Sequence, residues 1–326
     1  MKNKQLTISL LFLFLFSLGS LWAQPASKVT KDLITSGSEN RSFTSEINGK
    51  SYKLLVNLPQ NYHTSNTAKY PALYMLDGQW DFVSITSIYG SLHWDRHIPD
   101  LIIVGITYDG ANPDYENLRA SDLTPSKMSY FPTSGGGAKF VEVLEKEIIP
   151  IVDNTYRTNK KDRTIAGTSF AGLFPHYVLF NAPHLFNGYI INNPSLFYDD
   201  GLPFKYEEAY AKAHDTLDAK VYMVSGEFDN VPVFKKMTAQ IQSRKYKKLQ
   251  FDELIAGDTG HSGSKFEGYT KGMLHVYKRR GISFPEETLE EYAGEYKVGP
   301  GMDNLHIRAK EGHLICLLYT SPSPRD

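Results

Sequence analysis

The sequence predicts an α/β protein with a mostly parallel central sheet flanked by helices. Between residues 40 and 280, short runs rich in β-branched and aromatic residues alternate with longer segments of helical spacing. Some of these runs, such as 101–106, are apolar almost throughout, which is typical of parallel strands buried on both faces. The 326 residues, of which 41% are hydrophobic, suffice for one large domain and a smaller one.

The strands of this sheet are predicted from seven β-rich runs, at 52–56, 72–76, 101–106, 164–166, 189–192, 220–224 and 249–254. A helix is predicted after the glycine turn 135–137, because Phe140, Leu144, Ile148 and Val152 recur at helical spacing. The repeated change from strand to helix favours crossover connections and therefore a parallel sheet.

The first 23 residues have the form of a secretory signal peptide. Lys2 and Lys4 precede an apolar run that ends at Ala23. A transmembrane anchor fits less well, because the apolar run is short and no basic cluster follows it closely. We therefore expect a secreted or periplasmic protein with no stable membrane insertion once residues 1–23 are removed.

The charge of the chain is nearly balanced. The formal net charge is −1, and removal of the two lysines with the signal peptide makes it −3. Such a chain lacks the basic surface that nucleic acids attract, so we expect no nucleic-acid partner.

Ser169 is the candidate nucleophile. It lies in the run TIAGTSFAGL (164–173), where a predicted strand ends and apolar residues of helical spacing begin. The small residues Gly167 and Ala171 allow strand and helix to approach closely, so the run is typical of a nucleophile elbow. The alternative is a glycine-serine loop without chemistry, because matches to so short a motif also occur by accident.

A nucleophilic serine requires a base and a carboxylate that orients the base, and in α/β-hydrolases they follow in the order Ser, acid, His. Two acids, Glu227 and Asp229, follow the predicted strand 220–224. We select Asp229 as the triad acid, because it lies three positions beyond Gly226 and the turn can bring its carboxylate back over the sheet. Glu227 remains the alternative acid, and either residue can instead be a solvated loop charge.

His261 is the candidate base. It lies in a glycine-rich loop after the predicted strand 249–254. The chain has ten histidines, and we expect most of them to be structural or exposed. Only His261 has the expected chain order and loop position.

The oxyanion formed during ester cleavage needs two backbone donors. One is expected from Phe170, the residue after the nucleophile, and the other from Gln79, which follows the predicted strand 72–76 and the Asp77-Gly78 turn. An ordinary Asp-Gly turn without a catalytic role explains the segment 77–80 equally well.

Two residues are candidates for substrate binding. Trp80, together with Phe82, Trp94 and Tyr115, can form an aromatic wall, although aromatic residues are more often part of a core. Arg119 can bind a carboxylate or a sugar hydroxyl.

A structural ion pair between Arg119 and Asp122 explains the presence of this arginine equally well.

Four motifs together resemble the Putative esterase family, which is related to esterase D, trilactone siderophore esterases, bacterial feruloyl esterases and mycolyltransferases. These motifs are YPALYMLDG (70–78), RASDLTP (119–125), the helical segment 140–157, and GTSFAGL (167–173), and the resemblance extends from about residue 42 to residue 280. It implies an α/β-hydrolase fold and serine-dependent cleavage of carboxylic esters, without a metal ion or an organic cofactor.

The resemblance also implies catalytic roles for Ser169, His261, Gln79 and Phe170, and assigns the acid to Asp229 or Glu227. The chain departs from the family pattern at Thr168, where the family often has His, and at Ala171, where it often has Gly. Some siderophore-cleaving relatives depend mainly on Ser and His, which leaves the need for the acid open.

The expected domains are the signal peptide (1–23), an α/β-hydrolase domain (28–282) and the beginning of a small β domain (286–315). The spacing of Tyr292, Gly294 and Tyr296 resembles the first strand of the β domain often appended to secreted bacterial hydrolases. Residues 316–326 resemble a translated sequencing adapter and are set aside. They include Cys316, the only cysteine, so an internal disulfide is excluded.

Three functions compete. The first is a secreted serine esterase with a Ser-Asp-His triad, acting on a polysaccharide-linked acyl ester or a siderophore-type ester. The second is an acyltransferase that uses the same acyl-enzyme. The third is a non-catalytic module that binds a glycan or a protein on a hydrolase scaffold.

Overall fold

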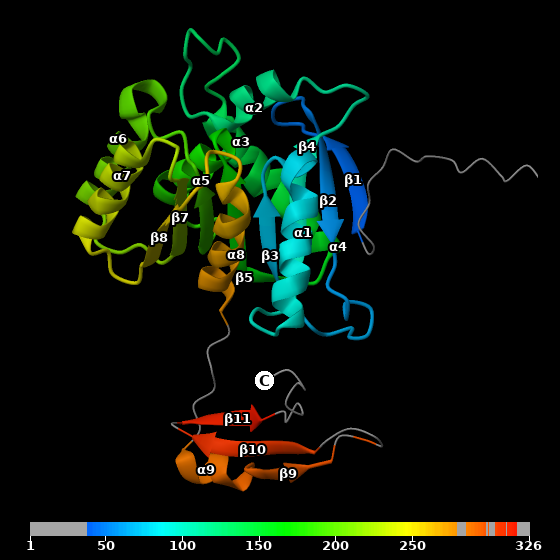
Figure 1. Ribbon diagram of the computed structural model, residues 1–326. Helices are drawn as coiled ribbons and strands as arrows, with labels where there is room; N and C mark the ends of the chain where they lie inside the picture. The colour runs from blue at the N-terminus through cyan, green and yellow to red at the C-terminus, as the bar shows by residue number, and fades with distance from the viewer. Residues whose placement is uncertain (1–37, 279–284, 298, 300–303, 311, 318–326) are drawn as a thin grey trace, which may run out of the picture. The chain divides into compact units, whose positions relative to one another are not determined.

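The computed structural model describes residues 38–278, 285–297, 299, 304–310 and 312–317 (Figure 1). The expected signal peptide lies outside these residues, as do the ends of the expected hydrolase domain. None of the helices within the described ranges has the length and apolar character needed to cross a membrane.

In the elements up to residue 278, one or more helices follow each strand from the third onward. In chain order they are β1 Ser38–Thr44, β2 Ser51–Asn57, β3 Tyr70–Met75, α1 Gly78–Trp94, β4 Ile102–Tyr108, α2 Tyr115–Leu123, α3 Gly137–Val143, the π-helical turn η1 Leu144–Ile148, α4 Ile149–Thr155, β5 Thr158–Thr168, α5 Phe170–Asn181, β6 Gly188–Asn192, α6 Tyr198–Ala213, β7 Lys220–Gly226, α7 Val231–Arg244, β8 Gln250–Ala256 and α8 Ser264–Tyr277.

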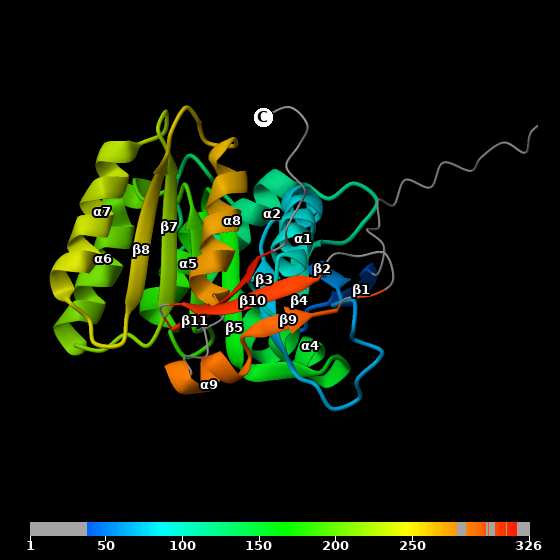
Figure 2. The same cartoon turned by 60° about the horizontal axis from the view of Figure 1, so that its bottom comes forward.

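The strands form one eight-stranded sheet in the order β1-β2-β4-β3-β5-β6-β7-β8. The pairs β1–β2 and β2–β4 are antiparallel, and the other five are parallel. Figure 2 shows β8 at one edge of the sheet and β1 at the other. The predicted α/β fold with a mostly parallel sheet is confirmed, and each of the seven predicted strands is present.

Helices cover both faces of the sheet, because successive strand residues point to opposite sides. In β3, Tyr74 packs with Phe140 and Phe174 of α3 and α5 on one side. Its neighbour Met75 belongs to the cluster on the other side, with Phe82 of α1 and Met273 of α8. This two-sided burial explains the nearly continuous apolar runs in the sequence.

The predicted helix after residue 137 is present, but it is divided. α3 passes through the π-turn η1 into α4. The four residues that predicted the helix, Phe140, Leu144, Ile148 and Val152, are all buried.

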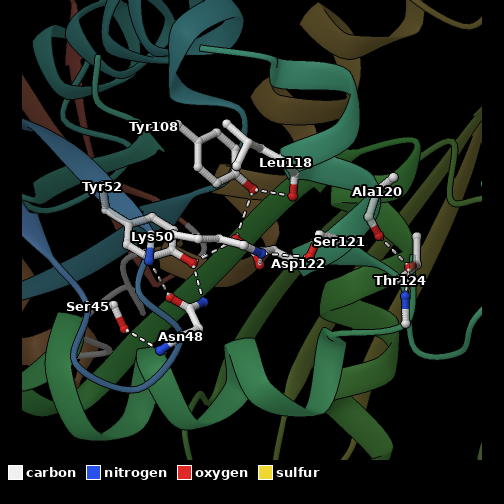
Figure 3. A network of polar contacts seen from close by, with 11 residues as sticks. Ser45, Asn48, Lys50, Tyr52, Tyr108, Leu118, Ala120, Ser121, Asp122 and Thr124 are labelled. Atoms are coloured by element: carbon white, nitrogen blue, oxygen red, sulfur yellow. Dashed lines mark hydrogen bonds and ion pairs between the residues drawn. The ribbon is translucent and has the colours of Figure 1, made fainter. Parts of the chain in front are cut away.

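Helix α2 is held to the antiparallel side of the sheet by a buried carboxylate (Figure 3). Asp122 accepts hydrogen bonds from the hydroxyls of Tyr52, at 2.7 Å, and Tyr108, at 3.1 Å. The Lys50 ammonium forms an ion pair with the same carboxylate. Burial raises the pKa of the Asp122 carboxyl, and the lysine charge opposes this shift.

The described C-terminal residues form α9, Glu286–Glu291, and a three-stranded antiparallel sheet of β9, β10 and β11. These strands span Gly294–Tyr296, Leu305–Lys310 and His313–Leu317. Strand β11 includes Cys316 and Leu317, which belong to segment 316–326, the one that resembles a translated sequencing adapter. Residues 318–326 of that segment lie outside the described residues.

Candidate active site

Four neighbouring parallel strands carry the candidate site. β5, β6, β7 and β8 lie side by side in the sheet. Ser169 directly follows β5, Asp229 follows β7, and His261 follows β8. Because the carboxyl ends of parallel strands meet at one edge of a sheet, the three residues share that edge although 92 positions separate the first from the last.

Ser169 occupies a sharp turn between β5 and α5, with φ 66° and ψ −121°. Its amide donates to the carbonyl of Asn192 in β6, at 3.1 Å, and its carbonyl accepts from the amide of Leu173, at 2.8 Å. A side chain at Gly167 would clash with the carbonyl oxygen of Ala171. The glycine therefore permits the close strand-helix approach of a nucleophile elbow.

His261 and Asp229 are in direct contact. The Nδ1 atom of His261 lies 2.5 Å from Oδ2 of Asp229. Both side chains are partly exposed, with 48% of the histidine and 24% of the aspartate accessible. The second imidazole nitrogen is thus left for another partner, as in a base that is oriented by a carboxylate.

Glu227, the alternative acid, has a different contact. Its Oε2 atom accepts the backbone N–H of Asp258, at 2.8 Å. The backbone N–H of Glu227 donates to the carbonyl of Ala256, at 3.0 Å. This residue therefore attaches the turn after β7 to the loop after β8, whereas Asp229 contacts the imidazole.

The two candidate oxyanion donors lie at the starts of helices. Phe170 is the first residue of α5 and Gln79 is the second residue of α1. Amides in the first turn of a helix have no acceptor within that helix and are free to bind an anion. The strands before them, β3 and β5, are direct neighbours, and the amide of Leu76 donates to the carbonyl of Ala166 at 2.9 Å.

The side chain of Gln79 bonds to Asp77 and Thr107. Its Nε2 atom donates to Oδ1 of Asp77, at 3.4 Å, and its Oε1 atom accepts from the hydroxyl of Thr107, at 2.7 Å. The preceding Asp77 has a left-handed backbone conformation, with φ 56°, and precedes the first turn of α1.

Arg119 is paired with Asp77, so the alternative in which it pairs with Asp122 is wrong. The guanidinium donates through Nε to Oδ1 and through Nη2 to Oδ2 of Asp77, at 2.6 and 2.7 Å. Asp122 is instead occupied by lysine and tyrosine partners. Burial raises the pKa of the Asp77 carboxyl, and the Arg119 charge opposes that shift.

Only part of the expected aromatic wall is present. Trp80 lies 5.9 Å from Tyr115, between ring centroids, and the Arg119 guanidinium lies 4.9 Å from the Trp80 ring. Phe82 belongs to the buried core, packed against the backbone of β4, and Trp94 is 84% exposed at the last residue of α1. The wall is therefore reduced to Trp80 and Tyr115, because Phe82 and Trp94 point elsewhere.

A cavity of about 370 Å³ opens at this edge of the sheet. Ser169, Asp229 and His261 line it, together with polar Asn193, Ser195, Ser225 and Asn230 and with apolar Pro194, Leu196, Phe197, Val233 and Phe234. Gln79, Trp80 and Arg119 are not among its lining residues. An adjoining groove of about 400 Å³ shares Leu196, Phe197 and Val233 with the cavity and includes Lys205 and Lys236.

Sequence reasoning missed one wall of this cavity. Asn193, Leu196 and Phe197 follow β6, and Val233 lies in the first turn of α7. The signal that could have identified the residues after β6 was their position in the chain. A segment that follows the carboxyl end of a parallel strand lies next to the site. Within the described parts of the chain, no cluster of three or more His, Cys, Asp or Glu side chains is arranged to hold a metal ion.

Comparison with known proteins gives matches along most of this domain. The ferri-bacillibactin esterase BesA of Bacillus subtilis (strain 168) is 30% identical over an alignment of 173 residues. This alignment covers 49% of this chain and 59% of the relative. The siderophore triacetylfusarinine C esterase of Aspergillus fumigatus is 27% identical over 156 residues, 46% of this chain and 53% of the relative. The chain thus spans little more than half the length of these two curated relatives.

A solved structure shares the fold. The IroE-like serine hydrolase from Shewanella oneidensis superimposes with a TM-score of 0.69 at 22% identity, covering 78% of this chain and 85% of the other. The architecture is accordingly the α/β-hydrolase fold. A family model described as Putative esterase matches residues 45–264, more than half of the chain. The resemblance noted in the sequence is therefore confirmed, and the chain belongs to the Putative esterase family.

Proposed function

We propose that this chain is a serine esterase that hydrolyses siderophore-type carboxylic esters with a Ser169-Asp229-His261 triad. The observation that carries the proposal is the 2.5 Å contact between His261 and Asp229 at a cavity that Ser169 also lines. The names of the two curated relatives favour a siderophore ester over a polysaccharide-linked ester.

In the proposed reaction, His261 Nε2 accepts the proton of the Ser169 hydroxyl as its oxygen attacks the ester carbonyl carbon. The Nδ1–H of the imidazole donates to Asp229, which stabilises the imidazolium. The amides of Gln79 and Phe170 stabilise the oxyanion. When the intermediate collapses, the imidazolium protonates the leaving alcohol; water then attacks the acyl-serine with His261 again as base.

The lining of the cavity supports a sizeable ester. Besides Ser169, Asp229 and His261 it includes apolar side chains, among them Leu196, Phe197 and Val233. These three residues also border the adjoining groove, so a substrate bound at Ser169 can extend from the cavity into the groove. An ester with a second bulky arm uses both hollows.

Export of the protein is part of this proposal. The support is the sequence of residues 1–23, with two lysines before an apolar run. Sequencing the N-terminus of protein recovered from the periplasm or the medium tests it. A mature chain that begins near Gln24 agrees with export, and an intact Met1 contradicts it.

The test of the reaction compares wild type with Ser169→Ala. The substrates are a trilactone siderophore, methyl ferulate, acetylated xylan and nitrophenyl butyrate. We expect the siderophore to give the highest kcat/KM. Loss of the nucleophile should lower turnover by about 10⁴ to 10⁶, as removal of a triad serine does. Circular dichroism and a thermal melt check that the variant is folded.

A covalent probe gives an independent result. A fluorophosphonate should modify wild type at Ser169, identified by peptide mass spectrometry, and leave Ser169→Ala unmodified. Full ester turnover by the purified alanine variant would exclude Ser169 as nucleophile. Ester formation with added alcohols in place of hydrolysis would indicate the acyltransferase, and a folded wild type that neither turns over nor reacts would favour the binding module.

A further inference from the structure

Asn193 connects the two loops that carry the proposed base and acid. It directly follows β6, between the strands that precede Ser169 and Asp229. Its Nδ2 donates to the backbone carbonyl of His261, at 2.8 Å, and to the hydroxyl of Ser264, at 2.6 Å. Its Oδ1 accepts the backbone N–H of Gly226, at 2.8 Å. One side chain therefore bonds to both the acid turn (226–230) and the base loop (257–262).

The geometry requires asparagine in particular. The residue is only 4% exposed, and its amide makes all three hydrogen bonds in the interior. A carboxylate lacks the donor and an aliphatic side chain lacks both groups. The backbone has φ 38°, in the left-handed region that asparagine tolerates better than most other residues.

The same segment also contacts the nucleophile. The carbonyl of Asn192 accepts the amide of Ser169, at 3.1 Å, and the amide of Ser195 donates to the carbonyl of Ser169, at 3.3 Å. The amide of Asn193 itself donates to the carbonyl of Val224 in β7, at 2.7 Å. Residues 192–195 thus contact all three segments that carry the proposed triad.

We propose that Asn193 is a positioning residue that fixes the His261 loop against the Asp229 turn and beside Ser169. The inference rests on the proposed function, because it assigns the asparagine to that triad. Although Asn193 lines the cavity, its side-chain amide bonds to Gly226, His261 and Ser264, so it acts by holding these segments. Its loss should therefore lower kcat while KM stays nearly unchanged, since displacement of a catalytic group by about 1 Å can cost about 100-fold in rate.

The test variant is Asn193→Gly, which removes the side chain and leaves the left-handed backbone unstrained. The matched control is Asn187→Gly, at the opposite end of β6. Asn187 also joins two strands, because its Oδ1 accepts the backbone N–H of Arg163 at 2.8 Å. If Asn193→Gly does not fold, Asn193→Ser replaces it, because a hydroxyl is too short to bond both loops.

Two rates are measured at equal folded fraction: ester hydrolysis, and modification of Ser169 by a fluorophosphonate. We expect Asn193→Gly to lower kcat and the modification rate together by about 10- to 100-fold. Asn187→Gly should change the melting temperature by a similar amount and change both rates less than twofold. Equal rates for the two variants would mean that Asn193 is merely structural.

The probe separates this inference from the proposed function. If wild type is modified by the fluorophosphonate but cleaves no tested ester, the substrate proposal fails. A slower modification of Asn193→Gly then still supports the positioning role. If wild type is not modified at Ser169 and has no turnover, both proposals are overturned.

Discussion

Ser169 adopts a backbone conformation that a non-glycine residue does not adopt without strain. With φ 66° and ψ −121°, the strain is of the order of 1–3 kcal/mol. Hydrogen bonds between its backbone and those of Asn192, Gly172, Leu173 and Ser195 hold it there. Stability is therefore lost at this position, where the serine lines the cavity.

This strain gives a stability prediction. Ser169→Gly should be more stable than Ser169→Ala by about 0.5–2 kcal/mol, because glycine relieves the strain but loses more chain entropy on folding. Both variants lack the hydroxyl and should be inactive. Urea unfolding of the two proteins measures the difference, and equal midpoints would show that the turn is unstrained.

The two acids differ in their partners, which gives a second prediction. Asp229→Asn should lower kcat by about 10³- to 10⁴-fold, because the amide does not stabilise the imidazolium and favours the wrong tautomer. Glu227→Gln keeps an acceptor for the Asp258 amide and should stay within about tenfold of wild type. Steady-state kinetics of both variants ranks them; the reverse order would transfer the role of the acid to Glu227.

The residues of the proposed triad were predictable, because the order of nucleophile, acid and base along the chain is fixed in this fold. Ser169, Asp229 and His261 each follow a recognisable strand, and that order was enough to propose them together. Asn193 was not found, because its importance depends on two loops that are 33 and 68 positions further along the chain. For Arg119 the structural partner considered was Asp122, which is close in sequence, whereas the actual partner Asp77 is close only in space.

At the scale of elements, the acid turn and the base loop behave as one unit. The amide of Phe228 donates to the carbonyl of Thr259, at 3.0 Å. A Cβ atom at Gly226 would lie 2.6 Å from the carbonyl oxygen of Gly260 and 2.8 Å from that of Thr259. The backbones of the acid turn and the base loop thus lie too close together for a residue with a side chain at position 226.

Gly226→Ala should therefore move the base loop. We expect kcat to fall by about 10- to 100-fold, because the displaced backbone is the one that carries His261. Gly260→Ala is the matched control, since a Cβ atom there meets nothing within 4 Å. Kinetics of both purified variants tests this, and wild-type activity in Gly226→Ala would show that the loops adapt.

The element boundaries show what the sequence pattern can and cannot reveal. Most of the seven predicted strands are apolar because helices cover them, whereas the edge strand β8 contains Asp252 and Glu253. β1 was missed, since it is an edge strand with Phe43 as its one large apolar residue. The first half of β5 was missed for a related reason, because Lys160 and Lys161 are exposed. The π-turn within the 137–155 helix leaves no mark in the periodicity.

At the scale of the whole molecule, a buried histidine couples stability to pH. His176 of α5 is fully buried, with Nε2 3.3 Å from the sulfur of Met237. Burial lowers the pKa of His176 to about 4, and the charge of Glu207 opposes the shift. The unfolded chain takes up this proton near pH 6.5, whereas the folded chain takes it up only near the lowered pKa.

The folded protein therefore keeps its full free energy of unfolding above pH 6.5. It loses part of that free energy as the pH falls from 6.5 to about 4, because only the unfolded chain takes up the proton of His176 in this range. Between pH 7 and pH 5 the loss should be about 2 kcal/mol in the free energy of unfolding. His176→Leu should remove this dependence, whereas His184→Gln, at an exposed histidine, should keep it. Urea unfolding at both pH values measures it, and equal losses in all three proteins would contradict the assignment.

The fold as a whole was predictable because one rule, burial on both faces of a parallel sheet, applies along most of the chain. The cavity was not, because its shape depends on side chains from β7, α7 and the loops together. The pattern of residues 286–315 suggested the start of a small β domain, and the described residues there form three short strands.

The mixed lining of the cavity has a consequence for evolution. Beside the proposed triad, the cavity is lined by the apolar residues Pro194, Leu196, Phe197, Val233 and Phe234. The side chains of these apolar residues are hydrocarbon and make no hydrogen bond to the proposed triad. Substitutions among these apolar residues can therefore change which ester is selected while the reaction is inherited unchanged, so new specificities can arise from this scaffold one neutral step at a time.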